Sequence, residues 1–277
     1  MPVIAMTREI GSRGTEVAAG VARELGLTIV DSEIIATPVA ERLGVDEETV
    51  LRNFNGSASM FDRWRLNHRK LSRYTSEQIL QLVQNNNVVV RGWGAASLLR
   101  EVPHAIGVRV CAPMEFRIAT MLERLGSKDM QAVADEIARY DAAHARTLSA
   151  YFNVDQEDAC LYHITLNTGR LPIDICVRFV CQLAGHRNAE ERPEPTLADK
   201  LLEAQIQSAL TEAISVAAVP SGIIVSARDG RVTLAGMAIT GAAVHTTANK
   251  VVGAIPGVIE IENRIITTPP RGRQSPL

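Results

Sequence analysis

Near the N-terminus the chain has residue types and spacing that suit phosphate binding. An apolar run at 3–6 leads into the segment TREIGSRGT at 7–15, and an amphipathic stretch begins there. A strand, a glycine-containing loop and a helix N-terminus together point backbone N–H groups and a helix dipole at an anion. The sequence therefore predicts a phosphate-binding loop formed by Gly11, Ser12, Arg13, Gly14 and Thr15.

This loop lacks the lysine of the full phosphate-loop pattern G-x-x-x-x-G-K-[ST]. Gly14 stands where the lysine is expected. If the chain transfers phosphoryl groups, another cation must stabilise the group in transit. Arg8 and Arg13 are nearest in sequence, and we predict that one of them supplies this charge. The alternative is a tight strand-to-helix turn that binds no ligand.

The elements that would position the loop alternate in type from residue 3 to about 185. Short apolar runs predict strands at 3–6, 28–30, 88–90, 106–112 and 163–166. Helical periodicity predicts helices at about 17–25, 32–43, 113–125, 128–150 and from 172 onward. Ser32, directly after Asp31, has the side chain of a helix N-cap. Strands that alternate with helices predict an α/β domain with a parallel, doubly wound sheet.

A change in composition predicts a domain boundary after residue 185. Residues 186–196 are charged and contain Pro193 and Pro195, which is typical of a linker. Residues 197–268 then predict a small α+β domain of order αββαβ, with Asp229-Gly230 as a hairpin turn. The tail at 269–277 is predicted to be disordered.

Composition excludes several classes of protein. The net charge is −2, so no overall positive field favours nucleic acid as a partner. No basic leader and no apolar run of ~20 residues is present, which predicts a cytoplasmic protein. The four cysteines form no C-x-x-C pair, and no pair of histidines stands at metal-ligand spacing.

Four segments carry a family resemblance: TREIGS at 7–12, RGWGA at 91–95, VRVCAP at 108–113 and LYHITLNTGRL at 161–171. In this order the chain, over about 3–184, resembles the cytidylate kinase-like family of nucleoside monophosphate kinases. The resemblance implies a P-loop kinase fold and ATP with Mg²⁺ as phosphoryl donor. It also implies a nucleotide acceptor, a pyrimidine nucleoside monophosphate such as CMP.

The resemblance further implies roles for individual residues. The loop from Gly11 to Thr15 would hold the donor phosphates. Arg117 and Arg124, seven residues apart and so on one helix face, would act with Arg8 and Arg13 on the phosphates. The residues implied to bind the acceptor are Asp31, Arg91, Trp93, Asp141, His144 and Arg146.

Three departures from the family pattern leave a second function open. The lysine is missing, Trp93 stands between two glycines where arginine is expected, and His144 also replaces an arginine. A nucleotide-binding regulatory protein with a degenerate kinase domain, signalling through its C-terminal domain, is therefore the alternative. From the residues alone, Trp93 could equally fill a core, and Arg117 and Arg124 could lie on a solvated helix face.

The C-terminal segments IIV at 223–225, DGRVTLAG at 229–236 and IPGVIEIEN at 255–263 resemble the BON domain, a bacterial module. That family is associated with phospholipid or cell-envelope binding, so a membrane-associated interaction protein is a further alternative. Basic residues in this domain are few and dispersed, which predicts weak or no membrane binding. We expect the domain instead to associate with itself or with the first domain, through an exposed strand edge or helix face.

Overall fold

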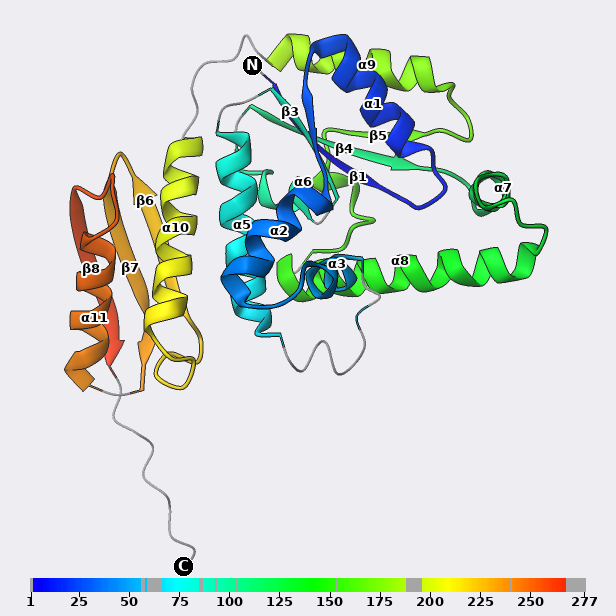
Figure 1. Cartoon of the computed structure of the whole chain (residues 1–277). Coiled ribbons are helices and arrows are strands. Elements are labelled where there is room, and N and C mark those ends of the chain that lie inside the picture. The colour runs from blue at the N-terminus through cyan, green and yellow to red at the C-terminus, as the bar shows by residue number, and fades with distance from the viewer. Residues whose placement is uncertain are drawn as a thin grey trace, which may run out of the picture. The chain divides into compact units, whose positions relative to one another are not determined.

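The computed structural model describes residues 2–55, 58, 66–84, 87–92, 94–102, 104–152, 154–187, 196–239 and 241–267. The chain forms two compact units (Figure 1). The first comprises residues 1–67 and 81–194, and the second comprises 68–80 and 195–277. Helix α5 (His68–Val83) therefore contributes residues to both units. The predicted linker and tail fall almost entirely outside the described residues and stay predictions.

Five strands form the sheet of the first unit. They are β1 (Val3–Arg8), β2 (Thr28–Val30), β3 (Val88–Arg91), β4 (Ala105–Cys111) and β5 (Ile164–Asn167), in the spatial order β2-β3-β1-β4-β5. All neighbouring pairs are parallel, so the predicted α/β class with a parallel sheet is confirmed. Strand order reverses at β1, and in such sheets ligands bind at the carboxyl ends of the strands beside the reversal.

Helices cover both faces of this sheet. Helices α1 (Gly14–Leu25) and α9 (Ile173–Arg187) lie on one face, and α2 (Ser32–Leu43), α6 (Ala95–Leu98) and α8 (Met130–Phe152) lie on the other (Figure 1). The unit also contains α3 (Glu47–Phe54), α7 (Met114–Leu125) and a 3₁₀ helix at Ala159–Leu161. None of the described helices has the length and apolarity needed to cross a membrane.

The core between the sheet and the α1–α9 pair fixes where the first loop begins. Val17 and Val21 of α1 pack with Ile4 and Ile106 of the sheet and Val180 of α9, and all are fully buried. Burying a side chain of this size contributes roughly 1.5–3 kcal/mol. Helix α1 is thus held firmly against the sheet, directly after the loop that follows β1.

The N-cap of helix α2 lies one residue earlier than the sequence suggests. Asp31, not Ser32, is its N-cap, and the Asp31 carboxylate accepts the N–H groups of Glu33 and Ile34 at 3.2 and 3.4 Å. The extended backbone of Asp31 and its longer side chain allow this geometry. The cap places the Asp31 carboxylate at the carboxyl end of β2.

The second unit has the predicted order of elements after α5: α10 (Leu197–Ala213), β6 (Ile223–Arg228), β7 (Arg231–Ala238), α11 (Gly241–Gly253) and β8 (Glu260–Thr267). The sheet order is β6-β7-β8, with β6 antiparallel and β8 parallel to β7. The predicted hairpin turn is present, because Asp229 and Gly230 both have positive φ, at 49° and 77°.

Both edges of this small sheet carry side-chain hydrogen bonds. On α10, Glu203 accepts the N–H of Ala227 at 2.9 Å, and Gln207 donates to the carbonyl of Ile223 at 2.8 Å. On β8, the N–H of Ile265 donates to the side chain of Asn263 at 3.1 Å. These bonds occupy backbone groups that an open edge would offer to another strand.

Candidate functional site

The loop after β1 is folded tightly on itself. Ser12 donates its N–H and its hydroxyl to the carbonyl oxygen of Glu9, at 3.2 and 2.7 Å. Ser12 is fully buried, and its own carbonyl accepts the Thr168 hydroxyl at 2.6 Å. Because Thr168 lies directly after β5, this bond ties the loop to the turn that follows the outer strand.

Two glycines give the loop its path. Gly11 has φ +78°, and a Cβ at this position would lie 2.7 Å from the carbonyl oxygen of Arg117. A Cβ on Gly14 would lie 2.7 Å from the Cβ of Arg8. Real Cβ atoms do not approach other heavy atoms so closely, so a side chain at either position would force the loop to move.

The loop ends at the start of α1, where backbone N–H groups lie at the N-terminus of the helix. Arg13 has a left-handed backbone with φ 58°, and its carbonyl accepts the N–H groups of Glu16 and Val17 at 3.0 and 3.2 Å. The first N–H groups of a helix have no acceptor within the helix and carry the positive end of its dipole. Residues 13–15 therefore present backbone donors suited to an anion.

Two arginines around the loop are paired with glutamates. Arg13 is exposed and binds Glu16 through Nε at 2.8 Å and through a second, shorter contact. The hydrogen bond to Glu16 raises the pKa of Arg13 and lowers that of Glu16. Arg109 of β4 donates to Glu9 at 2.8 Å. Neither guanidinium is free to meet a phosphate without leaving its glutamate.

Arg117 of α7 is buried and bound on every side. Its Nη2 lies 2.8 Å from both carboxylate oxygens of Asp141 on α8, and its Nε donates to the carbonyl of Ile10 at 2.7 Å. Its Nη1 lies 3.5 Å from Glu9. Burial raises the pKa of Asp141, although its bond to Arg117 acts in the opposite direction.

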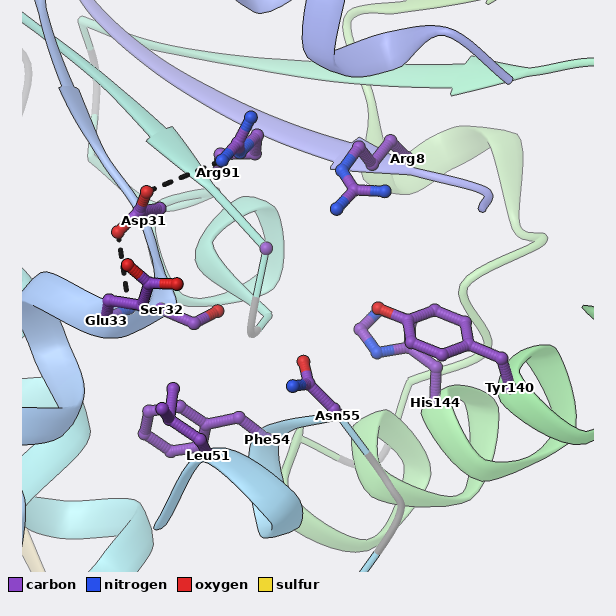
Figure 2. Close-up of a pocket in the computed structure, with 11 residues that line it drawn as sticks. Arg8, Asp31, Ser32, Glu33, Leu51, Phe54, Asn55, Arg91, Tyr140 and His144 are labelled. Carbon is purple, nitrogen blue, oxygen red and sulfur yellow. Dashed lines mark hydrogen bonds and ion pairs between the residues drawn. The ribbon is translucent and has the colours of Figure 1, made fainter. Parts of the chain in front are cut away.

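A cavity of about 240 Å³ opens at the carboxyl ends of β1, β2 and β3 (Figure 2). Strand ends, the start of α2, the end of α3 and the middle of α8 all contribute to its wall. It is lined by Arg8, Asp31, Ser32, Glu33, Leu51, Phe54, Asn55, Arg91, Gly92, Tyr140 and His144. Arginines, carboxylates, an amide and aromatic rings therefore face one space, which suits a polar ligand with an anionic end.

Arg8 faces this cavity without a partner. Among the described residues, none forms a hydrogen bond or ion pair with its guanidinium group. Figure 2 shows it extending from the end of β1 toward open space above Tyr140 and His144. Burial lowers the pKa of Arg8. The neighbouring phenol of Tyr140 acts in the opposite direction, and the charges of Arg91 and Arg124 lower the pKa further. A partly desolvated cation of this kind gains most from a bound anion.

Arg91 stands on the opposite side of the same cavity and is paired. Its Nη2 lies 3.4 Å from Asp31, the carboxylate that also caps α2 (Figure 2). Both side chains are partly exposed, at 19% and 30%, so the pair remains accessible from the cavity. The Asp31 carboxylate thus orients Arg91. The hydrogen bonds that Asp31 accepts at the start of α2 in turn hold the carboxylate in place.

Two rings of α8 form the wall below Arg8. Tyr140 and His144 lie one helical turn apart and stack with their ring centroids 6.1 Å apart and 15° between their planes. His144 is 8% exposed, and its Nδ1 has no hydrogen-bond partner among the described residues. Burial, followed by the charge of Arg8, lowers the pKa of His144 to about 4, so the ring is neutral at pH 7.

Comparison with known proteins identifies the first unit. Residues 3–170 match the sequence profile of the cytidylate kinase-like family. The chain belongs to the cytidylate kinase-like family. Relatives include the cytidylate kinase of Pyrobaculum aerophilum, 24% identical over 64% of this chain and 90% of that protein. The cytidylate kinase of Pyrobaculum islandicum is 23% identical over 68% of this chain and 97% of that protein.

A solved structure supports the fold assignment. An uncharacterised protein from Eubacterium ventriosum aligns with a TM-score of 0.53 at 16% identity, over 67% of this chain and 99% of that chain. At this identity the likeness concerns the fold and not the activity. The predicted membership of a nucleotide kinase family is confirmed.

The structure brings together part of the predicted site of this cytidylate kinase-like chain. Arg8, Asp31, Arg91 and His144 line one cavity, and residues 11–15 form the loop beside it. Arg124 is exposed on the last turn of α7. Other predicted residues do not line the cavity: Arg13, Arg117, Asp141 and Arg146, whose Nε donates to the carbonyl of Ala142. Trp93 lies outside the described residues.

Sequence reasoning missed several cavity residues. Glu33 and Ser32 follow Asp31 directly, and the strand-end position of Asp31 is a signal that could have found them. Asn55 and Phe54 come from the end of α3, and Tyr140 lies one turn before His144. The helical spacing of Tyr140 and His144 could have paired them, whereas no local pattern points to Asn55.

The residues present fit the Mg²⁺ that the family implies. Among the described residues no cluster of three histidine, cysteine or acidic side chains could hold a metal ion. Magnesium in phosphate sites, however, takes most of its ligands from phosphate and water and few from protein. The exposed Thr15 hydroxyl, at the serine or threonine position of the phosphate-loop pattern, would supply such a ligand.

Proposed function

We propose that this chain transfers the terminal phosphoryl group of ATP to a pyrimidine nucleoside monophosphate such as CMP. The observation that carries the proposal is Arg8, a partly desolvated guanidinium that lines the cavity beside Gly14 and has no hydrogen-bond or ion-pair partner among the residues that the structure describes. Family membership supports a nucleotide kinase, and the mixed lining of the cavity supports an acceptor with a phosphate at one end. An ATP-dependent reaction also favours the cytoplasm as its location.

The donor phosphates would lie on residues 11–15. Their backbone N–H groups and the dipole of α1 suit the β- and γ-phosphates, and a close approach is possible because Gly11 and Gly14 lack side chains. The Thr15 hydroxyl would hold a Mg²⁺ ion, which when bound neutralises charge on the donor phosphates. Arg8, next to Gly14 in space, would then take the part of the missing lysine.

The acceptor would occupy the cavity. Arg8 and Arg91 would bind its phosphate, because guanidinium groups match phosphate oxygens with paired hydrogen bonds. At the other end of the acceptor, the carboxylates of Asp31 and Glu33 would accept hydrogen bonds from hydroxyl and amino groups. The amide of Asn55 could both donate and accept. The rings of His144 and Tyr140 on α8 would form one wall of the acceptor site. His144 is neutral at pH 7, so it adds no positive charge to those of Arg8 and Arg91.

In the reaction an oxygen of the acceptor phosphate attacks the γ-phosphorus of ATP. The bond from the γ-phosphorus to the bridging oxygen breaks, ADP leaves, and the acceptor becomes a nucleoside diphosphate. Negative charge spreads over the oxygens in transit, and stabilising that charge is the main task of the protein in such transfers. Arg8 would act on this charge, a role supported by its position beside Gly14 of the loop and in the wall of the cavity.

A kinetic comparison tests this function. ADP release is measured with CMP, UMP and dCMP as acceptors for the wild type, Arg8→Gln, Arg13→Gln and the control Arg23→Gln, an exposed residue of α1. We expect Arg8→Gln to lower kcat by ~10²-fold, the scale of losing one preorganised donor. Arg13→Gln should have a small effect because Arg13 is paired with Glu16. Equal kcat for Arg8→Gln and wild type would contradict the assignment of Arg8.

One observation favours a second candidate, a nucleotide-binding regulatory protein without turnover. Arg13, Arg109 and Arg117 are all paired with carboxylates, which leaves little free positive charge around the loop. Nucleotide binding in calorimetry, together with no ADP release above background for any acceptor, would favour this candidate over the kinase.

We propose that the C-terminal elements α10 to β8 are a BON-like interaction module. The αββαβ order and the Asp229-Gly230 turn support this likeness. The bonded edges of its sheet make strand addition less favourable than contact through a helix or the open sheet face. There Ile224, Met237 and Ile266 are exposed at 66%, 53% and 65%.

A further inference from the structure

We propose that Arg117 and Asp141 are positioning residues that hold the phosphate-binding loop in shape and touch neither donor nor acceptor. The inference rests on the proposed function in one respect, that the loop binds the donor phosphates. It assigns both residues roles different from those that the family resemblance implies, a phosphate clamp for Arg117 and an acceptor contact for Asp141.

Arg117 is bonded to the loop itself. Its Nε donates to the carbonyl oxygen of Ile10 at 2.7 Å, and its backbone carbonyl lies where a side chain on Gly11 would have to go. The loop backbone therefore runs directly against the first turn of α7. A displacement of Arg117 would move the carbonyl of Ile10 and the residues that follow it.

Asp141 holds Arg117 in this orientation. Both of its carboxylate oxygens lie 2.8 Å from Nη2, so the guanidinium is fixed from α8 as well as from the loop. Arg117 is 5% exposed. To clamp a phosphate it would have to break these bonds and leave the Asp141 carboxylate without its partner, which is unfavourable for a partly buried charge.

Glu9 completes the support from the other side. It accepts hydrogen bonds from Arg109 at 2.8 Å and from the N–H of Ala112 at 3.2 Å, and it lies 3.5 Å from Arg117. The two arginines and two carboxylates balance, so this network adds no net positive charge to the loop. Its contribution to phosphate binding is therefore the geometry of the backbone donors and not electrostatic attraction.

Replacing Arg117 and Asp141 together distinguishes their effect on the position of the loop from their effect on the stability of the fold. Either Arg117→Met or Asp141→Asn by itself leaves a buried charge without its partner and should lower the thermal midpoint. The double variant, Arg117→Met with Asp141→Asn, removes both charges and buries no unpaired charge. Methionine has no N–H group for the carbonyl of Ile10, so the double variant should fold but hold the loop poorly.

The experiment is calorimetric titration of the full chain with ATP and Mg²⁺, and separately with CMP, combined with thermal unfolding. Asp135→Asn is the matched control, because Asp135 is an exposed residue of the same helix bonded to Gln131. We expect the double variant to bind ATP more weakly by roughly 10- to 100-fold, the scale of a ~1 Å displacement of a binding group. CMP affinity should stay at the wild-type value, because neither Arg117 nor Asp141 lines the cavity. An unchanged CMP affinity also shows that the first unit of the variant is folded.

Several results would overturn the inference. Wild-type ATP affinity in the double variant would show that the pair is structural without positioning the loop. Tighter ATP binding by Asp141→Asn would show that Asp141 competes with phosphate for Arg117. Equal losses of ATP and CMP affinity would indicate general damage. ATP binding by the wild type without transfer to CMP would contradict only the proposed function, whereas no ATP binding at all would contradict both.

Discussion

Lowering the pH should destabilise the first unit through a single buried group, His144. The ring is 8% exposed, and its pKa is lowered from 6.5 to about 4, first by burial and then by the charge of Arg8. Asp31, Glu33 and Tyr140 line the same cavity, but the shift at His144 comes from burial and from Arg8. The folded chain therefore binds a proton at His144 more weakly than the unfolded chain does.

The sign follows from the two pKa values. Above pH 6.5 the imidazole is neutral in both states and contributes no pH dependence. Between pH 6.5 and 4 the unfolded state carries the proton and the folded state does not, so stability falls as the pH falls through this range. With these values, the free energy of unfolding should be lower at pH 5 than at pH 7 by about 2 kcal/mol from His144 alone.

Urea denaturation at pH 7 and pH 5 measures this difference, with wild type compared with His144→Gln. Tryptophan fluorescence reports on the first unit, because both tryptophans, Trp64 and Trp93, belong to its ranges. Glutamine does not titrate, so the wild type should lose about 2 kcal/mol more than the variant between the two pH values. The matched control is His186→Gln, an exposed histidine of α9, which should behave as wild type. The same pH dependence in wild type and His144→Gln would refute the reasoning.

Further predictions concern the loop, the boundary and the second unit. Gly14→Val should abolish ATP binding in calorimetry while circular dichroism stays at the wild-type signal, because a side chain there collides with Arg8; unchanged ATP affinity would remove the site. Limited proteolysis should cut within 186–196 and release two folded pieces, whereas first cuts inside 88–112 would contradict the domain plan. The full chain should sediment weakly or not at all with anionic vesicles at physiological salt, since its C-terminal basic residues are dispersed; tight, salt-resistant binding would favour a membrane role.

The sheet of the first unit could be predicted because its signals are local. Each strand is a short apolar run, and each is separated from the next by a segment with helical period, so parallel pairing follows from connection length. The position of the loop after β1 was also predictable, since its glycines stand between the apolar run of a strand and the start of a helical period. The helix cap was placed one residue late, because Ser32 and Asp31 both have capping side chains and only the backbone conformation decides between them.

The environment of each arginine could not be predicted in the same way. The spacing of Arg117 and Arg124 places both on α7, but Arg117 is buried against Asp141 while Arg124 is exposed on the last turn. Likewise, Arg8 and Arg13 are equally near the missing lysine in sequence. The helical spacing of Arg13 and Glu16 could have suggested their contact, but only the tertiary structure shows that Arg8 meets an open cavity.

Arg8 has no hydrogen-bond or ion-pair partner in the described part of the chain, and this is itself an argument for a ligand. A guanidinium group that is taken from water without a carboxylate beside it costs stability, and Arg13, Arg109 and Arg117 each have one. A bound anion would remove this cost, so binding energy and folding energy are linked at this residue. Ligand at 100 times its Kd stabilises a folded protein by about 2.7 kcal/mol. In the Arg8→Gln variant, the free chain should therefore be no less stable than wild type, while the stabilisation by nucleotide should be largely lost.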